Sequence, residues 1–308
     1  MARLHARIGT FRQLEILLAV YKTGSITQAS NELFLTQPTV SMQLKKLSTS
    51  VGAELYNQVG RKLIFTEAGL EVVAGAREVL GCIERLEMKL SDMQGLKAGT
   101  LRLAVVTTAK YFIPHLLGEF IKHYPDIDID FKVGNRQQII DRMENGEDDF
   151  YVFSHPPKNQ ALMLDEFLPN PLVAIAKEGH PLSKEKNIPL QRFLDHSFLM
   201  RESGSGTRYA LENHMEKLDI KLSSRMTIES NEAIKHAVMS GLGVSILSSH
   251  TLAFGGSLGL CRLDVQDLPI MTKWYLGRLK SKKMSIVAET FLNYVVDRGR
   301  KGLLEALR

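Results

Sequence analysis

Closely spaced helix signals near the start of the chain constrain its fold more than any other feature. Apolar side chains recur at helical spacing over residues 11–21, and Gly24 follows them as a stop signal. Ser25 and Gln28 then form an S-x-x-Q capping box, which predicts a short helix through about Phe34. This short helix is the candidate first helix of a helix-turn-helix.

A third helix completes this motif. Thr36 caps it, and Pro38 is tolerated in its first turn because no amide donor is missed there. Val40, Leu44 and Leu47 recur at spacings of four and three, so they must face the core. The opposite face is short, polar and not acidic, and consists of Gln37, Pro38, Thr39, Ser41, Met42 and Lys45.

Such a face can enter the major groove of DNA. We expect Gln37, Thr39 and Ser41 to reach base edges, and Lys45 or Lys46 to hold phosphates. The alternative is a helix face that is merely solvated. The sequence context favours DNA, because a hairpin predicted over residues 56–66 follows this helix.

Positive charge is concentrated at this end of the chain. The hairpin carries Gly60, Arg61 and Lys62 at its tip, which predicts a basic wing that touches backbone phosphates. Residues 1–66 hold eight Lys and Arg against three Glu, a net charge of +5, whereas the other 242 residues are balanced. A basic segment on a neutral body suits a polyanion such as DNA, although many solvated surfaces are also basic.

A long helix is predicted over residues 66–93. Its apolar residues alternate spacings of four and three, as in a coiled-coil seam: Val72, Ala76, Val79, Ile83, Leu86, Leu90 and Met93. The seam predicts a dimer, which would present two recognition helices to a palindromic site; the alternative is packing on its own domain. Residues 95–99 are expected to form a hinge.

Four motifs, taken in this order, resemble the DNA-binding domain of the LysR family of bacterial transcription regulators. They are F-R-Q-L-E-I-L-L-A-V, G-S-I-T-Q-A-S, L-T-Q-P-T-V-S-M-Q-L-K-K-L and F-T-E-A-G, and they span roughly residues 9–69. Ser48 and Gln58 stand where the family often has Glu and Arg, so one wing contact to phosphate lacks its usual residue. The candidate DNA contacts are Ser25, Thr27, Gln28, Thr36, Gln37, Pro38, Thr39, Ser41, Met42, Lys45, Arg61 and Lys62.

Strand-like runs alternate with helical patterns after residue 99. This order predicts a βαβαβ unit over residues 101–153 and a second set over residues 172–247, hence an α/β domain of two lobes like a periplasmic binding protein. The fold resembles the LysR effector-binding domain. The expected domains are residues 9–66 (winged helix-turn-helix), 67–95 (linker helix) and 96–308, with lobe I at about 100–171 plus 276–308 and lobe II at about 172–275.

Two loops at strand ends are candidates for ligand binding, because ligands of open α/β folds lie beyond the carboxyl ends of strands. Thr107 and Thr108 follow the first strand of lobe I. Residues 201–208 of lobe II offer hydroxyls, backbone amides and two guanidinium groups, which predicts an anion cradle, although a surface turn rich in Gly and Ser is the alternative. The candidate effector ligands are Thr107, Thr108, His155, Arg201, Ser203, Gly204, Ser205, Thr207, Arg208 and Asn231.

Two of these candidates have simpler interpretations. Asn231, with Ser230, stands where a helix begins, and capping alone would explain it. His155 precedes two prolines at a strand end and could be a turn residue.

The strings R-E-S-G-S-G-T-R and S-N-E-A-I-K-H-A-V-M-S-G-L-G-V-S-I-L-S-S-H-T resemble the CbbR-like branch of the family, which controls carbon-fixation (Calvin-cycle) operons. That resemblance implies phosphorylated sugars, related metabolites or NADPH as effectors, which suits an anion cradle. The strand at residues 150–153 is bulkier than the D-L-A-I usual in the family, which could narrow the pocket.

The sequence disfavours several other classes of protein. It shows no G-x-S-x-G, H-E-x-x-H or P-loop spacing, and Cys82 and Cys261 lie far apart and outside any metal-binding cluster, so we expect no enzyme, metal or resident cofactor. It also shows no signal peptide and no long apolar run, which predicts a cytoplasmic protein. The expected partners are double-stranded promoter DNA, a small anionic coinducer and further copies of the chain as a dimer of dimers, with RNA polymerase a further candidate.

Overall fold

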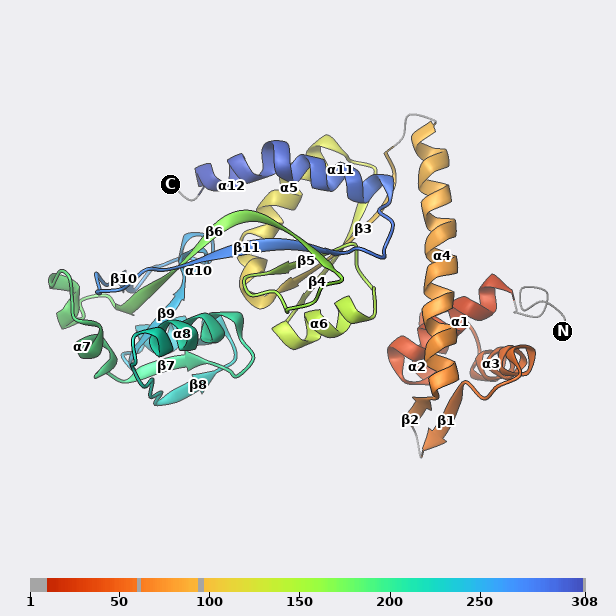
Figure 1. Cartoon of the computed structure of the whole chain (residues 1–308), viewed down its shortest axis with the longest axis horizontal. Coiled ribbons are helices and arrows are strands. Elements are labelled where there is room, and N and C mark those ends of the chain that lie inside the picture. Colours follow the sequence, from red (N-terminus) through yellow and green to blue (C-terminus); the bar gives the residue numbers. More distant parts are fainter. Residues whose placement is uncertain (1–9, 60–61, 94–96, 307–308) are drawn as a thin grey trace. The chain divides into compact units, whose positions relative to one another are not determined.

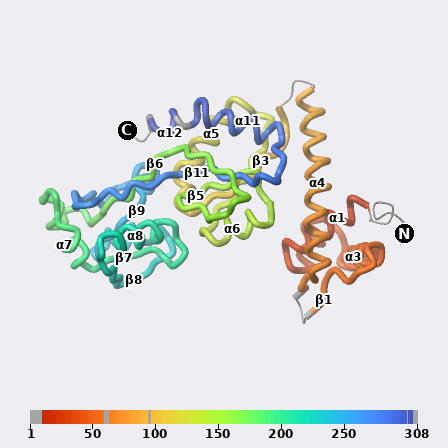
Figure 2. Tube along the Cα trace, viewed as in Figure 1, coloured from red at the N-terminus to blue at the C-terminus, as the bar shows by residue number. Residues whose placement is uncertain are grey.

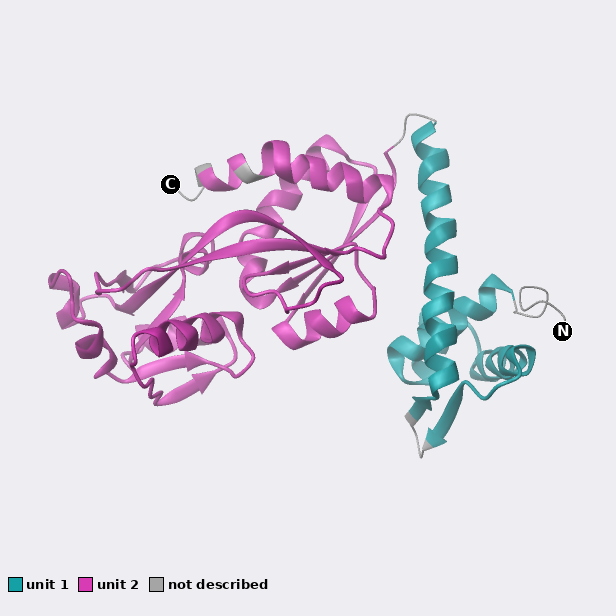
Figure 3. Ribbon diagram, in the orientation of Figure 1, with its two compact units in different colours: residues 1–93 teal, residues 94–308 magenta. Residues whose placement is uncertain are grey.

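The computed structural model describes residues 10–59, 62–93 and 97–306. The chain divides into two compact units, residues 1–93 and residues 94–308 (Figure 3). Residues 95 and 96 of the expected hinge lie outside the described residues.

Unit 1 has the expected order of elements (Figure 1). It contains α1 (Phe11–Thr23), α2 (Ile26–Glu32), α3 (Gln37–Val51), the antiparallel strands β1 (Tyr56–Val59) and β2 (Lys62–Phe65), and α4 (Glu67–Met93). Its core collects the inward residues of the first three helices, including Leu17, Val40 and Leu44, together with Val73 and Ala76 of α4. The helix-turn-helix, the hairpin and the long helix are therefore confirmed.

Two local predictions in unit 1 were only partly right. The second helix ends at Glu32 rather than near Phe34, because Phe34 has a positive φ of 55° that a helix cannot contain. At Ser25, the expected bond from the Gln28 N–H to the Ser25 hydroxyl forms at 3.4 Å. The complete reciprocal capping box lies instead at the start of α1, between Thr10 and Gln13.

Unit 2 is built on one nine-stranded mixed sheet with the order β4-β3-β5-β11-β6-β9-β7-β8, and β10 pairs with β6. Its strands are β3 (Gly99–Val106), β4 (Ile127–Gly134), β5 (Phe150–Phe153), β6 (Leu162–Lys177), β7 (Phe198–Arg201), β8 (Met226–Ile228), β9 (Val244–Ser248), β10 (Leu260–Arg262) and β11 (Ile270–Leu279). Its helices are η2 (Thr107–Tyr111), α5 (Ile113–His123), α6 (Arg136–Glu144), η3 (Pro181–Lys184), α7 (Leu190–Leu194), α8 (Gly206–Lys217), α9 (Asn231–Met239), α10 (Ser249–Ala253), α11 (Ile286–Tyr294), η4 (Val295–Gly299) and α12 (Arg300–Ala306).

Two long antiparallel strands, β6 and β11, join the two lobes of this sheet and run side by side through unit 2 in Figures 1 and 2. In lobe II, β6 pairs with β9 over residues 172–175; in lobe I, β11 pairs with β5 over residues 275–277. The second set of elements predicted from the sequence begins at residue 172, whereas β6 already begins at Leu162 and has 16 residues. The two-lobed α/β fold is confirmed.

The bulky strand β5 packs into the core of lobe I. All four of its side chains are buried, and Tyr151 and Phe153 join Ile139 and Met143 of α6 in one cluster. The Tyr151 hydroxyl accepts a hydrogen bond from the Asp148 N–H at 2.9 Å. The large side chains of β5 therefore fill the interior of lobe I.

Candidate functional site

Helix α3 divides its residues as the sequence predicted. Val40, Leu44 and Leu47 are fully buried, and the candidate DNA contacts Gln37, Pro38, Ser41, Met42 and Lys45 are exposed. Thr39 is half-buried, and its hydroxyl shares a 2.8 Å hydrogen bond with that of the exposed cap residue Thr36. The helix therefore presents a mostly polar face over its first two and a half turns or so, Gln37 to Lys45, and Thr36 caps its start.

The remaining DNA-contact candidates lie on neighbouring elements. Thr27 and Gln28 are exposed on α2, while Ser25 is half-buried and caps that helix. Lys62 begins β2, whose register with β1 sets the place of the wing. Arg61 lies outside the described residues.

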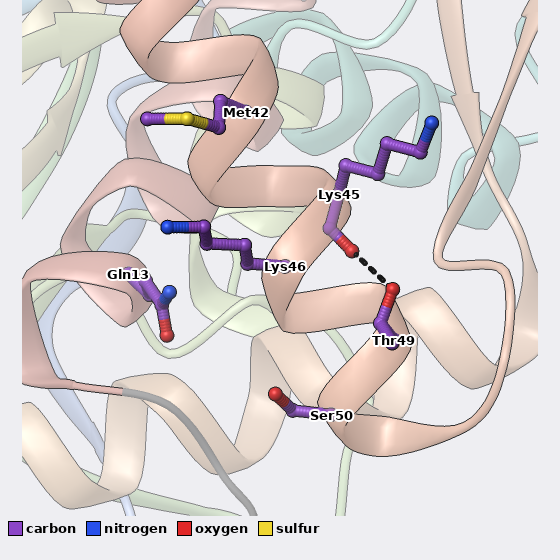
Figure 4. Close-up of a pocket in the computed structure, with 6 residues that line it drawn as sticks. All are labelled: Gln13, Met42, Lys45, Lys46, Thr49 and Ser50. Atoms are coloured by element: carbon purple, nitrogen blue, oxygen red, sulfur yellow. Dashed lines mark hydrogen bonds between the residues drawn. The ribbon is translucent and has the colours of Figure 1, made fainter.

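A groove of about 490 Å³ adjoins the far end of α3 (Figure 4). Its lining comes from α1 and α3 and consists of Gln13, Met42, Lys45, Lys46, Thr49 and Ser50. In Figure 4 the Lys46 side chain extends on the side of Gln13 and Met42, whereas Lys45 extends away from them. The Gln13 amide donates to Gln43 at 2.8 Å, which fixes one wall. Gln13, Thr49 and Ser50 therefore extend the basic, polar surface of α3 beyond the DNA contacts predicted from the sequence.

A second group of polar residues lies between the lobes of unit 2. Thr108 follows β3 in lobe I, and Asn231 begins α9 in lobe II. Their side chains are 7% and 1% exposed, and the Asn231 amide donates to the Thr108 hydroxyl at 3.2 Å. Asn231 accepts in turn from Arg201 at the end of β7. These three residues, far apart in the sequence, form one hydrogen-bonded chain across the lobes.

Arg201 is the buried charge of this site. Its side chain is only 4% exposed, and its Nε and Nη2 donate to the two carboxylate oxygens of Glu202 at 2.7 and 2.8 Å. A buried guanidinium of this kind requires anionic partners. Glu202 was not among the residues expected to bind a ligand.

Helix α8 brings its N-terminus to the same place. Ser205 and Thr207 are buried there, and Gly204 supplies the φ of +86° that the preceding turn requires. A Cβ added to Gly206 would lie 2.7 Å from the Ser154 hydroxyl oxygen of lobe I, so the start of α8 closely approaches the other lobe. Amides at a helix N-terminus favour anions. We call Thr108, Arg201, Ser205, Thr207 and Asn231 the interlobe site.

The other predicted ligands lie less centrally. Ser203 is exposed, as is Gly204. The Thr107 hydroxyl donates to the Gly134 carbonyl at 3.1 Å, and Arg208 donates to the Arg201 carbonyl at 3.3 Å and to Glu212. These bonds give Thr107 and Arg208 structural roles beside the site.

His155 closes the lobe I side of the site. Burial, helped by the positive charge of Arg136, lowers the pKa of His155 to about 4, so its ring is neutral at pH 7. Its buried Nδ1 has no hydrogen-bond partner among the described residues, and its ring meets that of Tyr209 edge-on at 5.2 Å. Arg136, which the sequence reading missed, donates to the His155 carbonyl at 2.9 Å. An arginine directly after the cap residue of α6, at the end of β4, was the available signal.

An ion pair also connects the two lobes. The Lys110 ammonium of lobe I lies 3.0 Å from a carboxylate oxygen of Glu232 in lobe II. Burial opposes ionisation of Glu232, but the neighbouring Tyr111 hydroxyl and Lys110 ammonium lower its pKa to about 2.

The described residues contain no cluster of three potential metal ligands. Among the described helices, none combines the length and the apolar character that a membrane span requires.

Comparison with known proteins gives two family matches. Residues 11–70 match the model "Bacterial regulatory helix-turn-helix protein, lysR family", and residues 94–300 match "LysR substrate binding domain". The chain is 50% identical over 287 residues to the HTH-type transcriptional activator CmpR of Synechocystis, covering 93% of this chain and 94% of that protein. It is 37% identical to the RuBisCO operon transcriptional regulator of Acidithiobacillus ferrooxidans, covering 94% of each.

Two solved structures of transcription regulators are also similar to this chain. The regulatory domain of Synechocystis CcmR, in complex with 2-PG, is 48% identical, with a TM-score of 0.61, and covers 64% of this chain and 95% of that one. A full-length variant of OxyR from Pseudomonas aeruginosa has a TM-score of 0.70 at 20% identity, covering 93% of this chain and 97% of that one, which shows a shared fold.

Proposed function

Because this chain belongs to the LysR family of DNA-binding transcription regulators, and to the branch of CmpR and the RuBisCO operon regulators, we propose that a small phosphorylated carboxylate switches it by binding at the interlobe site. The resemblance seen in the sequence is thereby confirmed for both family and branch. The chain is a regulator, and its relatives are regulators rather than enzymes.

One observation carries the effector proposal. The chain of hydrogen bonds from Arg201 through Asn231 to Thr108 joins a buried positive charge in lobe II to lobe I. An anion bound at Arg201 changes the contacts on both lobes at once, which is how a ligand shifts a two-state equilibrium. A phosphorylated carboxylate is favoured because the CcmR domain, which is 48% identical to this chain, was solved in complex with 2-PG, that is, 2-phosphoglycolate.

The DNA-binding part of the proposal rests on unit 1. We assign residues 9–66 to DNA binding, 67–95 to a linker helix and 96–308 to effector binding. The polar face of α3 is assigned to base edges, with Thr27, Gln28 and the wing residues Arg61 and Lys62 at the backbone. Two copies joined through α4, and two such dimers, would place paired recognition helices on promoter DNA in the bacterial cytoplasm, where RNA polymerase is the further partner.

Thermal denaturation of the full-length chain tests the effector. A ligand at about 100 times its dissociation constant stabilises the protein by about 2.7 kcal/mol. We expect 2-phosphoglycolate to raise the midpoint, and glycolate to leave it unchanged. Sugar phosphates and NADPH belong in the same panel, since the carbon-fixation branch suggests them as well.

Two variants locate the binding. Arg201→Ala and Thr108→Val should abolish the rise in midpoint while retaining binding to DNA. Lys217→Ala, a change of an exposed residue at the other end of α8, is the control and should respond like the parent chain. A full response from Arg201→Ala would move the effector elsewhere.

A further inference from the structure

The buried guanidinium of Arg201 already holds a carboxylate that belongs to the chain itself. Glu202 receives two parallel hydrogen bonds from it, at 2.7 and 2.8 Å, and Asn231 takes a bond from the third nitrogen. A bidentate pair of this kind is among the strong hydrogen-bonding arrangements in proteins. An anion that arrives at the interlobe site therefore meets an arginine that is already engaged.

The two partners of this pair differ in how firmly they are held. The Arg201 side chain is 4% exposed, whereas that of Glu202 is 17% exposed. Glu202 also begins the turn before α8, in which the Ser205 N–H donates to the Glu202 carbonyl at 3.2 Å and Gly204 is left-handed. The carboxylate is thus the partner that borders solvent, and the guanidinium is the one enclosed in the site.

Resting on the proposed function, we propose that Glu202 is a built-in competitor of the effector for Arg201. In the empty domain it neutralises a charge that would be costly to bury alone. An effector carboxylate or phosphate takes its place, and Glu202 swings out to water. The exchange sets the effector concentration at which the regulator responds, and it rejects uncharged ligands, which cannot replace the carboxylate.

This role has a thermodynamic signature that a positioning role lacks. Removing the Glu202 charge destabilises the empty domain and leaves the liganded domain unaffected, so effector binding becomes tighter. If Glu202 instead oriented Arg201 toward the effector, the same change would weaken binding. The sign of the change in affinity separates these two roles.

The experiment is calorimetric titration of the full-length chain and its Glu202→Gln and Glu202→Ala variants with 2-phosphoglycolate, together with their unliganded thermal midpoints. We expect binding about tenfold tighter, the equivalent of one hydrogen bond to a charged group, and a lower unliganded midpoint. The matched control is Glu185→Gln, which breaks the Arg192–Glu185 pair, bidentate as well but exposed on lobe II. This control should bind 2-phosphoglycolate like the parent chain.

Each result leads to a different conclusion. If the parent chain binds and the Glu202 variants bind equally or more weakly, the competitor role is wrong and the effector proposal stands. If the parent chain does not bind 2-phosphoglycolate, the proposed effector itself is wrong, and the competitor role with it. Should both variants fail to fold, Glu202→Asp keeps the charge but is one methylene too short for the bidentate pair, and it must still bind more tightly than the parent chain.

Discussion

Single residues in unit 2 combine burial with polar chemistry. His250 is fully buried between Phe112 and Trp274, and burial lowers its pKa to about 4, as it does, with Arg136, for His155. In the unfolded chain both imidazoles titrate near pH 6.5. Below that pH the unfolded state therefore binds more protons than the folded state.

Acid should consequently destabilise the chain before its carboxylates titrate. Above pH 6.5 each neutral histidine contributes fully to the free energy of unfolding. This contribution is lost as the pH falls toward 4, and the loss is about 2 kcal/mol for each histidine at pH 5. Thermal unfolding between pH 7 and pH 5 measures this slope. The double variant His155→Gln and His250→Gln should flatten it, and substitution of the exposed His236 should not. An equally steep slope in the double variant would contradict these two pKa values.

Variants of α3 should distinguish residues that recognise the base sequence from residues that bind the DNA backbone. Ser41→Ala removes a hydroxyl expected at a base edge, so it should weaken binding to the preferred site by about 1 kcal/mol and spare random DNA. Lys46→Ala removes a charge beside the groove, so it should weaken both and lower the salt slope by about 1. Fluorescence anisotropy over a salt series measures these effects, with Lys22→Ala, whose ammonium pairs with Glu32, as the control. Equal losses on both DNAs from Ser41→Ala would refute its assigned role.

The residues predicted from the sequence share one property: they are polar and lie where a strand ends or a helix begins, as Thr108, Arg201 and Asn231 do. Topology brings such positions together, so they can be found without coordinates. Glu202 directly follows β7 and Glu232 lies in the first turn of α9, so both meet this criterion, but neither was selected because a carboxylate is not expected to bind an anion. Lys110 and Glu232 stand 122 positions apart, and their pairing depends on how the two lobes meet.

At the scale of elements, α4 has two different halves. Ala76 is buried in the core of unit 1 and Val72 packs against that core, whereas Val79, Ile83, Leu86, Leu90 and Met93 are between 37% and 83% exposed. The predicted seam is therefore split: its first residues pack on their own domain, the alternative weighed from the sequence, and its later residues present an apolar stripe. We expect a second copy of the chain to cover that stripe.

A charge placed on this stripe should break the assembly and leave the fold intact. Leu86→Glu introduces a carboxylate at a side chain that is 52% exposed, so the helix content should persist while the sedimenting species becomes smaller. Glu87→Gln, at an exposed neighbour, should sediment like the parent chain. If Leu86→Glu also retained the parent mass, another surface would join the copies.

The strands β6 and β11 show why part of the fold escaped the sequence. The first ten residues of β6 include Asp165, Glu166, Pro169 and Pro171, residue types that are uncommon in strands and typical of loops. Its stability comes from pairing with β11 over ten positions, Leu162–Leu172 against Ile270–Leu279, with one irregularity at Trp274 and Tyr275. A partner about a hundred residues away leaves no local periodicity.

At the scale of the whole molecule, the chain joins a DNA-binding unit to a domain whose two lobes are connected by two strands and by the hydrogen bonds of the interlobe site. Coupling between these units requires that effector binding change how paired recognition helices sit on DNA.

A footprint of the full-length chain on DNA selected from a random pool, with and without 2-phosphoglycolate, tests this central claim most directly. We expect a palindromic sequence to be enriched and its pattern of protection to change when the effector is added. The Arg201→Ala variant should protect the same sequence without that change. Failure to enrich any sequence at low salt, or a footprint that stays identical in saturating effector, would contradict this claim.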